Sequence, residues 1–376
     1  MIKWEDVYKV VEATAPLYVA LILGYGSVKW WKIFTPDQCG AINRFVCFFT
    51  LPLYTFDFTA HVDPFKWNYR FIAADAISKV IIVVILAFWA KLSNKGSYAW
   101  SITSFSLCTL TNSLVVGVPL MKAMYGQIGV DIVVQSSVVQ AIIWMTLLLI
   151  VLECYRTAGI DISSNDKKIS VFADLNDNGV TAATTKDLEI NAVEECVGDK
   201  SSSSDTPQSY WSLIKVVGFK VAMNPNSYAV FIGLIWAIIA SRCHIKMPSI
   251  IEGSISIMSK AGAGTAMFSM GIFMALQKKI IACGLRLTVF GMVLRFIAGP
   301  AAMAIGCIAA GLHGDVLRVA IVQSALPQAI ASFIFAKEYG LHAEVLSTAV
   351  IFGTMVSVPV LIAFYIGLDV LHLHFL

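Results

Sequence analysis

The chain has 376 residues, of which 58% are hydrophobic and only 14% are charged, with a formal net charge of +3. A water-soluble protein of this length could not bury so much apolar surface, and the small, scattered charge does not indicate a nucleic-acid partner. The eight cysteines include no C-x-x-C pair, which favours buried thiols over a metal site or a disulfide framework.

Ten apolar segments follow one another along the chain. Most approach the ~20 apolar residues that a helix needs to cross a bilayer. They lie at 13–28, 39–59, 70–91, 98–124 and 130–154, and then at 210–240, 247–276, 281–311, 315–338 and 343–370. With five spans in each half, the second half must enter the membrane from the opposite side. The sequence therefore predicts an all-α polytopic membrane protein of ten helices in two inverted five-helix repeats.

A polar stretch at 155–209 separates the two halves. It is acidic, rich in serine and poor in aromatic residues. Such a composition cannot bury enough apolar surface to fold stably. We therefore expect residues 1–154 and 210–376 to form the repeats, joined by a flexible loop. A simple tether is favoured over a regulatory or targeting segment.

The second and fifth segments add polar groups near the middle of the membrane. Thr55 follows a proline in the second segment, and Gln140 lies in the fifth. Each residue alone is more typical of polar packing than of a ligand site. Aliphatic residues such as Leu51 and Ile330 could form an apolar wall suited to a ring-bearing substrate, although singly they are ordinary core residues.

The third segment contains two ionisable residues, Asp75 and Lys79. They are four residues apart, so they share one face of a helix and can pair. Ionisable groups inside a membrane helix cost at least ~2.5–3.5 kcal/mol each and usually face a cavity. A proton-responsive or site-supporting pair is favoured, and the alternative is a static salt bridge. The sequence assigns no role to a further ionisable residue, Arg295 in the eighth segment.

The fourth and ninth segments are each interrupted near their middle. The fourth carries Thr111, Asn112 and Pro119 within an apolar run, and the ninth carries Pro327 followed by Gln328. Lipid cannot satisfy a broken backbone, so such breaks survive only where they line a cavity within protein. Interrupted helices at corresponding places in two repeats are the best sequence pointer to the binding site of a transporter.

The amides at these breaks, Asn112 and Gln328, can donate hydrogen bonds to an anion. A helix that begins at a break also presents free N–H groups and the positive end of its dipole. Two such ends that meet would suit a carboxylate. The alternative is that each amide satisfies the broken backbone beside it, and the two roles do not exclude each other.

Known enzyme motifs are absent from the sequence. There is no H-E-x-x-H zinc motif, no P-loop and no G-x-S-x-G elbow. We therefore expect no enzymatic activity, no cofactor and no metal site.

Several longer strings resemble the PIN-FORMED auxin efflux carriers of plants. The likeness covers both membrane halves and is carried by Gly24–Cys39, Ile42–Val46, Ala336–His342 and Leu346–Gly353. The short central segment is similar to that of the short-loop branch of the family. Within that branch, the chain resembles the fifth member.

This resemblance implies ten helices with the N-terminus on the non-cytosolic side and a cytosolic central loop. It also implies a homodimer in membrane lipid, in which helices one, two, six and seven form a scaffold. The remaining helices, including a crossed fourth and ninth, are then expected to move as an elevator that carries indole-3-acetate. Short-loop members are associated with the endoplasmic reticulum, whereas the plasma membrane is the location of long-loop members.

The resemblance also implies roles for individual residues. Asn112 is expected to bind the substrate carboxylate, with Asp75 and Lys79 as its support. The pocket and crossover positions fall on Leu51, Thr55, Gln140, Ile330 and Pro327.

Two positions depart from the family pattern. Thr111 stands where most members have proline, and Met145 stands where many have a tyrosine. Thr111 restores a backbone N–H at the break, so transport strength is the property that this departure puts in doubt. Two alternatives to an auxin carrier are a carrier of another organic carboxylate and a membrane receptor that binds auxin without moving it.

Overall fold

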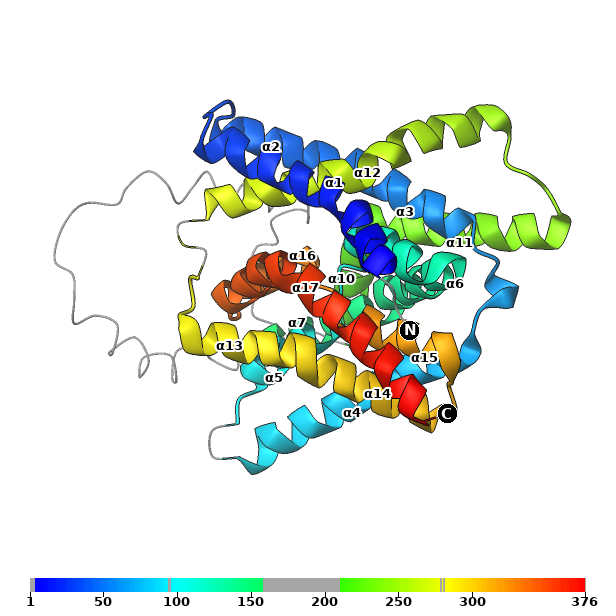
Figure 1. Ribbon diagram of the computed structural model, residues 1–376. Helices are drawn as coiled ribbons and strands as arrows, with labels where there is room; N and C mark the ends of the chain where they lie inside the picture. The colour runs from blue at the N-terminus through cyan, green and yellow to red at the C-terminus, as the bar shows by residue number, and fades with distance from the viewer. Residues whose placement is uncertain (1–3, 94–95, 158–209, 278, 280, 376) are drawn as a thin grey trace.

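Every regular element in the computed structural model is a helix, within the described residues 4–93, 96–157, 210–277, 279 and 281–375 (Figure 1). In this part of the chain seven helices are long and apolar enough to cross a membrane. They cover residues 8–29, 36–60, 69–92, 113–156, 225–243, 285–309 and 343–370. The all-α membrane class is confirmed, whereas ten spans and inverted repeats stay predictions. Nearly all of the predicted central loop lies outside the described residues.

The described helices fall before and after that central segment. The first half contains α1 (Trp4–Lys29), α2 (Pro36–Phe45), α3 (Leu51–Ala60), α4 (Tyr69–Leu92), α5 (Tyr98–Thr109), α6 (Val118–Val139) and α7 (Met145–Thr157). The second half contains α10 (Tyr210–Met223), α11 (Pro225–Cys243), α12 (Ser249–Leu276), α13 (Leu285–Val293), α14 (Gly299–Ala309), α15 (Gly314–Ser324), α16 (Ile330–Glu338) and α17 (Ala343–Phe375). A short 3₁₀ turn, η2 (Pro64–Lys66), precedes α4, and wider π-helical turns continue several helices: η1 (Val46–Thr50), η3 (Ser113–Gly117), η4 (Gln140–Trp144) and η6 (Leu294–Ala298).

The predicted breaks shorten the helices on either side of them. Helix α5 has 12 residues, α15 has 11 and α16 has nine. At 1.5 Å per residue none exceeds about 18 Å, which is well short of a bilayer core. These helices are therefore half-spans that end inside the protein.

Each break is followed by a Tyr-Gly pair that turns the chain again. Gly126 has φ +63°, and Gly340 has φ +65°. This left-handed backbone region is open to glycine at little cost, whereas a side chain would be strained there. Gly126 thus divides α6 into the second half of the broken helix and the start of the next span.

The most extensive contacts between helices fall into two groups, which α6 joins through its contact with α1. In the first group α1 packs along α12, and α3 packs against both α11 and α12. In the second, α4 packs against α14 and α5, while α17 contacts α13, α15 and α16. Figure 1 shows α1, α2, α3, α11 and α12 together on the upper side, with α4, α5, α13 and α14 below.

Two glycines bring α1 and α12 into close approach. A Cβ atom at Gly24 would lie 2.1 Å from the carbonyl oxygen of Phe268, and one at Gly271 would lie 2.0 Å from that of Leu21. Neither distance is possible for a real side chain, so only glycine permits this contact between backbones. Gly271 of α12 therefore serves packing within the chain.

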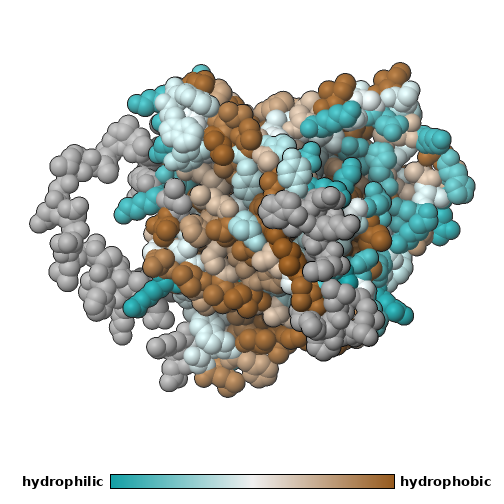
Figure 2. All heavy atoms as spheres, in the orientation of Figure 1, coloured by the Kyte–Doolittle hydropathy of each residue, from teal (hydrophilic) through white to brown (hydrophobic). Residues whose placement is uncertain are grey.

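Large apolar side chains lie on the outside of the molecule. Leu92, Ile250, Ile257, Leu285 and Ile308 are all more than 70% exposed. Figure 2 shows broad apolar areas between hydrophilic regions. Such a surface is stable in contact with lipid rather than water, in agreement with the composition.

Candidate functional site

The two helix breaks meet and pair through their backbones. Thr111 and Gln328 form an isolated antiparallel bridge. Asn112 N–H donates to the Pro327 carbonyl at 2.8 Å, and Ala329 N–H donates to the Leu110 carbonyl at 3.2 Å. The breaks thus satisfy each other's backbone groups in the middle of the protein, as lipid could not.

Gln140 completes the backbone hydrogen bonds of Thr111. Its Oε1 accepts from Thr111 N–H at 2.9 Å and from the Thr111 hydroxyl at 3.1 Å. Its Nε2 donates to the Thr111 carbonyl at 2.9 Å. The side-chain amide therefore pairs with the broken segment as a neighbouring strand would. In this conformation Gln140 holds the break rather than facing an open cavity.

Gln328 is fully buried and uses its donors on the protein itself. Its Nε2 donates to the Ser106 carbonyl at 2.9 Å and to the Ser332 hydroxyl at 2.8 Å. Its Oε1 has no hydrogen-bond partner within the described residues. The amide joins the carboxyl end of α5 to the first turn of α16, so both of its N–H groups are already occupied.

Asn112 differs from the other two amides because its side chain is half-buried and has no hydrogen bond to the described residues. It stands directly before η3, which continues into α6, so the first N–H groups of a long helical segment follow it. No acidic residue lies in the first turn of η3 or of α16. Asn112 is therefore the amide best placed to donate to an anion at the amino ends of these two helices.

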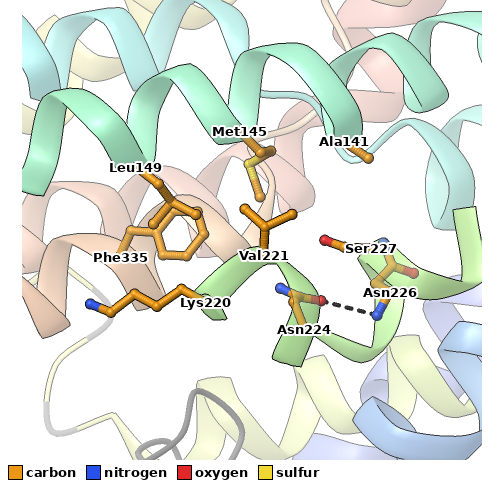
Figure 3. Close-up of a pocket in the computed structure, with 9 residues that line it drawn as sticks. All are labelled: Ala141, Met145, Leu149, Lys220, Val221, Asn224, Asn226, Ser227 and Phe335. Carbon is orange, nitrogen blue, oxygen red and sulfur yellow. Dashed lines mark hydrogen bonds between the residues drawn. The ribbon is translucent and has the colours of Figure 1, made fainter. Parts of the chain in front are cut away.

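Thr55 lies on α3 and contacts the start of α11. It is buried, and its hydroxyl donates to Oδ1 of Asn226 at 2.5 Å. Asn226 in turn lines a small cavity between α7, α10, α11 and α16 (Figure 3). The other lining residues are Ala141, Met145, Leu149, Lys220, Val221, Asn224, Ser227 and Phe335.

This cavity is close to the place where the two helix breaks meet, which we call the crossing. Its lining residue Ala141 directly follows Gln140, which pairs with Thr111 there. Its volume of about 40 Å³ holds roughly one water molecule. An indole ring does not fit there unless the surrounding helices separate. Met145 lies in its wall. Leu51 and Ile330 pack against the main hydrophobic core and are not among the lining residues.

Lys220 at the edge of this cavity is already paired. Its Nζ lies 2.7 Å from Glu153 and 2.6 Å from Glu338, and it donates to the Tyr339 hydroxyl at 2.8 Å. The cluster ties α10 to α7 and to the end of α16. Since two carboxylates surround the ammonium group, Lys220 is not free to bind an anionic ligand in this conformation.

Asp75 and Lys79 form the predicted pair in the interior of α4. Lys79 Nζ lies 2.7 Å from both carboxylate oxygens, and both side chains are buried. Trp144 donates its indole N–H to Asp75 at 2.9 Å, and Lys79 Nζ lies 4.8 Å from the Trp144 ring centre. The sequence offered little to connect Trp144 with this pair, because the two helices are distant along the chain.

Arg295 is also part of the crossing, a role that the sequence did not reveal. It is fully buried in η6, and its guanidinium donates to the carbonyls of Leu107, Leu110 and Ser324. A lone arginine inside an apolar run was the only available signal of such a role. Its partners are backbone atoms, which sequence patterns do not identify.

A family model described as membrane transport protein matches residues 9–365. The chain is 64% identical to auxin efflux carrier component 5 of Arabidopsis thaliana, over 99% of this chain and 100% of the relative. The chain belongs to the PIN-FORMED family of membrane transport proteins.

Other PIN-FORMED relatives match over nearly the same length. The probable auxin efflux carrier component 5a of Oryza sativa subsp. japonica is 58% identical, over 99% of this chain and 100% of the relative. Auxin efflux carrier component 8 of Arabidopsis thaliana is 38% identical, over 98% and 100%. As a PIN-FORMED protein the chain is a multi-pass membrane transporter and not an enzyme, as the sequence predicted.

Proposed function

We propose that this protein carries the indole-3-acetate anion across a membrane. The observation that supports this most directly is the side-chain amide of Asn112, which has no hydrogen-bond partner among the described residues and lies beside the amino ends of two broken helices that meet. Such ends carry partial positive charge and unpaired N–H groups, which suit a carboxylate. The relatives named as auxin efflux carriers support the choice of auxin as that carboxylate.

In this proposal each predicted site residue has a defined task. Asn112 donates to the carboxylate, and Leu51 and Ile330 contact the ring when the helices separate. Gln140, Gln328 and Pro327 act on the crossing itself, because their hydrogen bonds go to its backbone. Thr55 acts through Asn226, which its hydroxyl contacts. Asp75 and Lys79 support the moving helices from a buried position.

We further propose an elevator movement with alternating access. The close mutual packing of α1, α3, α11 and α12 supports it, because these helices could stay in place as a scaffold. The second group, which contains the crossing and the Asp75–Lys79 pair, would then move past them. The resemblance to short-loop family members supports a homodimer in the endoplasmic reticulum membrane, which moves auxin between the cytosol and the lumen.

Uptake into proteoliposomes tests the proposal. We expect purified protein to accumulate labelled indole-3-acetate, and unlabelled auxin to compete better than a bile-acid-like or other carboxylate. An imposed membrane potential supplies about 2.3 kcal/mol per charge for each 100 mV, so the rate should respond to it. Preference for an unrelated carboxylate would favour the rival carrier. Binding of auxin without flux would favour a receptor.

A further inference from the structure

Arg295 is a buried cation without a carboxylate partner among the described residues. Its side chain has no exposed surface, and it lies in η6, the wide turn between α13 and α14. Gly299 makes this position possible, because a Cβ atom there would lie 2.6 Å from the Cys108 carbonyl. The close approach of α14 to α5 brings the guanidinium to the crossing. A buried charge is costly unless it is paired or hydrogen-bonded, so its partners are informative.

The partners of Arg295 are the carboxyl ends of both broken helices. Nη1 donates to the Leu107 carbonyl at 3.1 Å and to the Leu110 carbonyl at 3.2 Å, at the end of α5. Nη2 donates to the carbonyl of Ser324, the last residue of α15, at 2.5 Å. One guanidinium thus serves carbonyl groups that the helices themselves leave without partners.

The charges at the crossing can be added approximately. Each carboxyl end of a helix carries about −0.5 of an elementary charge, and each amino end carries about +0.5. The full charge of Arg295 therefore offsets the two carboxyl ends. The buried Asp75–Lys79 pair adds no net charge. The amino ends of η3–α6 and of α16 keep their positive character, because no acidic residue lies in either first turn.

We propose that Arg295 is the fixed counter-charge of the two carboxyl ends and thereby makes the neighbouring site prefer an anion to a neutral ligand. It is a positioning residue, since it acts on the helix ends and not on the substrate. This inference rests on the proposed function, in which a carboxylate binds beside Asn112. Without Arg295 the negative carboxyl ends would oppose the charge of that carboxylate.

Competition binding with two ligands of nearly equal shape tests this role. Indole-3-acetate carries the charge, and indole-3-acetamide does not. We expect Arg295→Gln to weaken binding of the acetate about tenfold or more, because a unit charge is lost from a water-poor site. Binding of the amide should change less than twofold. The control is Arg286→Gln, which removes an exposed charge from the same membrane segment and should leave both affinities unchanged.

If Arg295→Gln weakens the binding of both ligands equally, the role of Arg295 is merely structural and the proposal is overturned. An unchanged preference for the acetate over the amide would overturn it as well. If the glutamine variant is not recovered folded, Arg295→Lys takes its place in the same competition assay. A preserved preference with a lowered melting temperature supports the proposal, and a lost preference refutes it. If the wild-type protein instead binds a different carboxylate, and binds it better than the amide of that same acid, auxin is refuted as the substrate. The effect of Arg295→Gln can then still be measured with that second acid and amide pair. No preference for any carboxylate would overturn both.

Discussion

Replacing Gln140 by leucine removes the side chain that pairs with the broken backbone at Thr111. The change keeps a similar volume but leaves the buried N–H and carbonyl of Thr111 without their partners. An unsatisfied buried polar group costs about 1–3 kcal/mol, so the two together should lower the free energy of unfolding by about 2–6 kcal/mol. Equilibrium unfolding in mixed micelles measures this quantity.

Gln127→Leu is the matched control for this experiment. Gln127 is exposed, and its amide donates to Asp131 at 2.8 Å. An exposed hydrogen bond of this kind contributes little, so the control should change the free energy of unfolding by less than about 0.5 kcal/mol. If Gln140→Leu is no more destabilising than Gln127→Leu, the backbone at the crossing does not depend on this amide.

Three further changes test other parts of the protein. Asn112→Ala should weaken auxin binding by about 1.5–3 kcal/mol, the contribution of a hydrogen bond to a charged group, and unchanged affinity would remove its proposed role. Asp75→Asn should slow uptake more than it weakens binding, whereas a pure affinity defect would contradict a supporting role. Hydrogen bonding to Asp57 raises the pKa of His61, at the end of α3, to about 9. The stability that His61 contributes should therefore be complete below about pH 6.5 and lost towards pH 9, so the melting temperature of wild type should fall in that window relative to His61→Gln. If the melting temperatures of wild type and His61→Gln change with pH in parallel, this reasoning is refuted.

The positions of the two breaks could be predicted because their cause is local. Prolines, glycines and amides within apolar runs are unfavourable in a continuous membrane helix. The Tyr-Gly pair after each break is also a local feature, and both glycines adopt the left-handed conformation. Leu51 and Ile330 were less informative, because an aliphatic residue suits a core as well as a pocket wall.

The partners at the crossing could not be predicted, because they depend on packing between distant segments. Gln140 was recognised as a polar residue near the middle of the membrane, but its contact with Thr111 follows from the path of the chain after Gly126. Arg295 was noticed as an ionisable residue, yet it contacts backbone carbonyls of two other helices. Carbonyl groups are present at every residue, so sequence patterns cannot single out which ones remain unpaired.

The antiparallel bridge between Thr111 and Gln328 has a consequence for the order of folding. A ribosome that adds 5–20 residues per second needs about 10–40 s to make the chain between these two positions. During that time Leu110 and Asn112 lack the partners that the second half will supply. Gln140 is made within seconds of Thr111 and can hold that residue first. The nascent chain therefore enters the membrane with the Leu110 carbonyl and the Asn112 N–H still waiting for Ala329 and Pro327, their backbone partners from the second half.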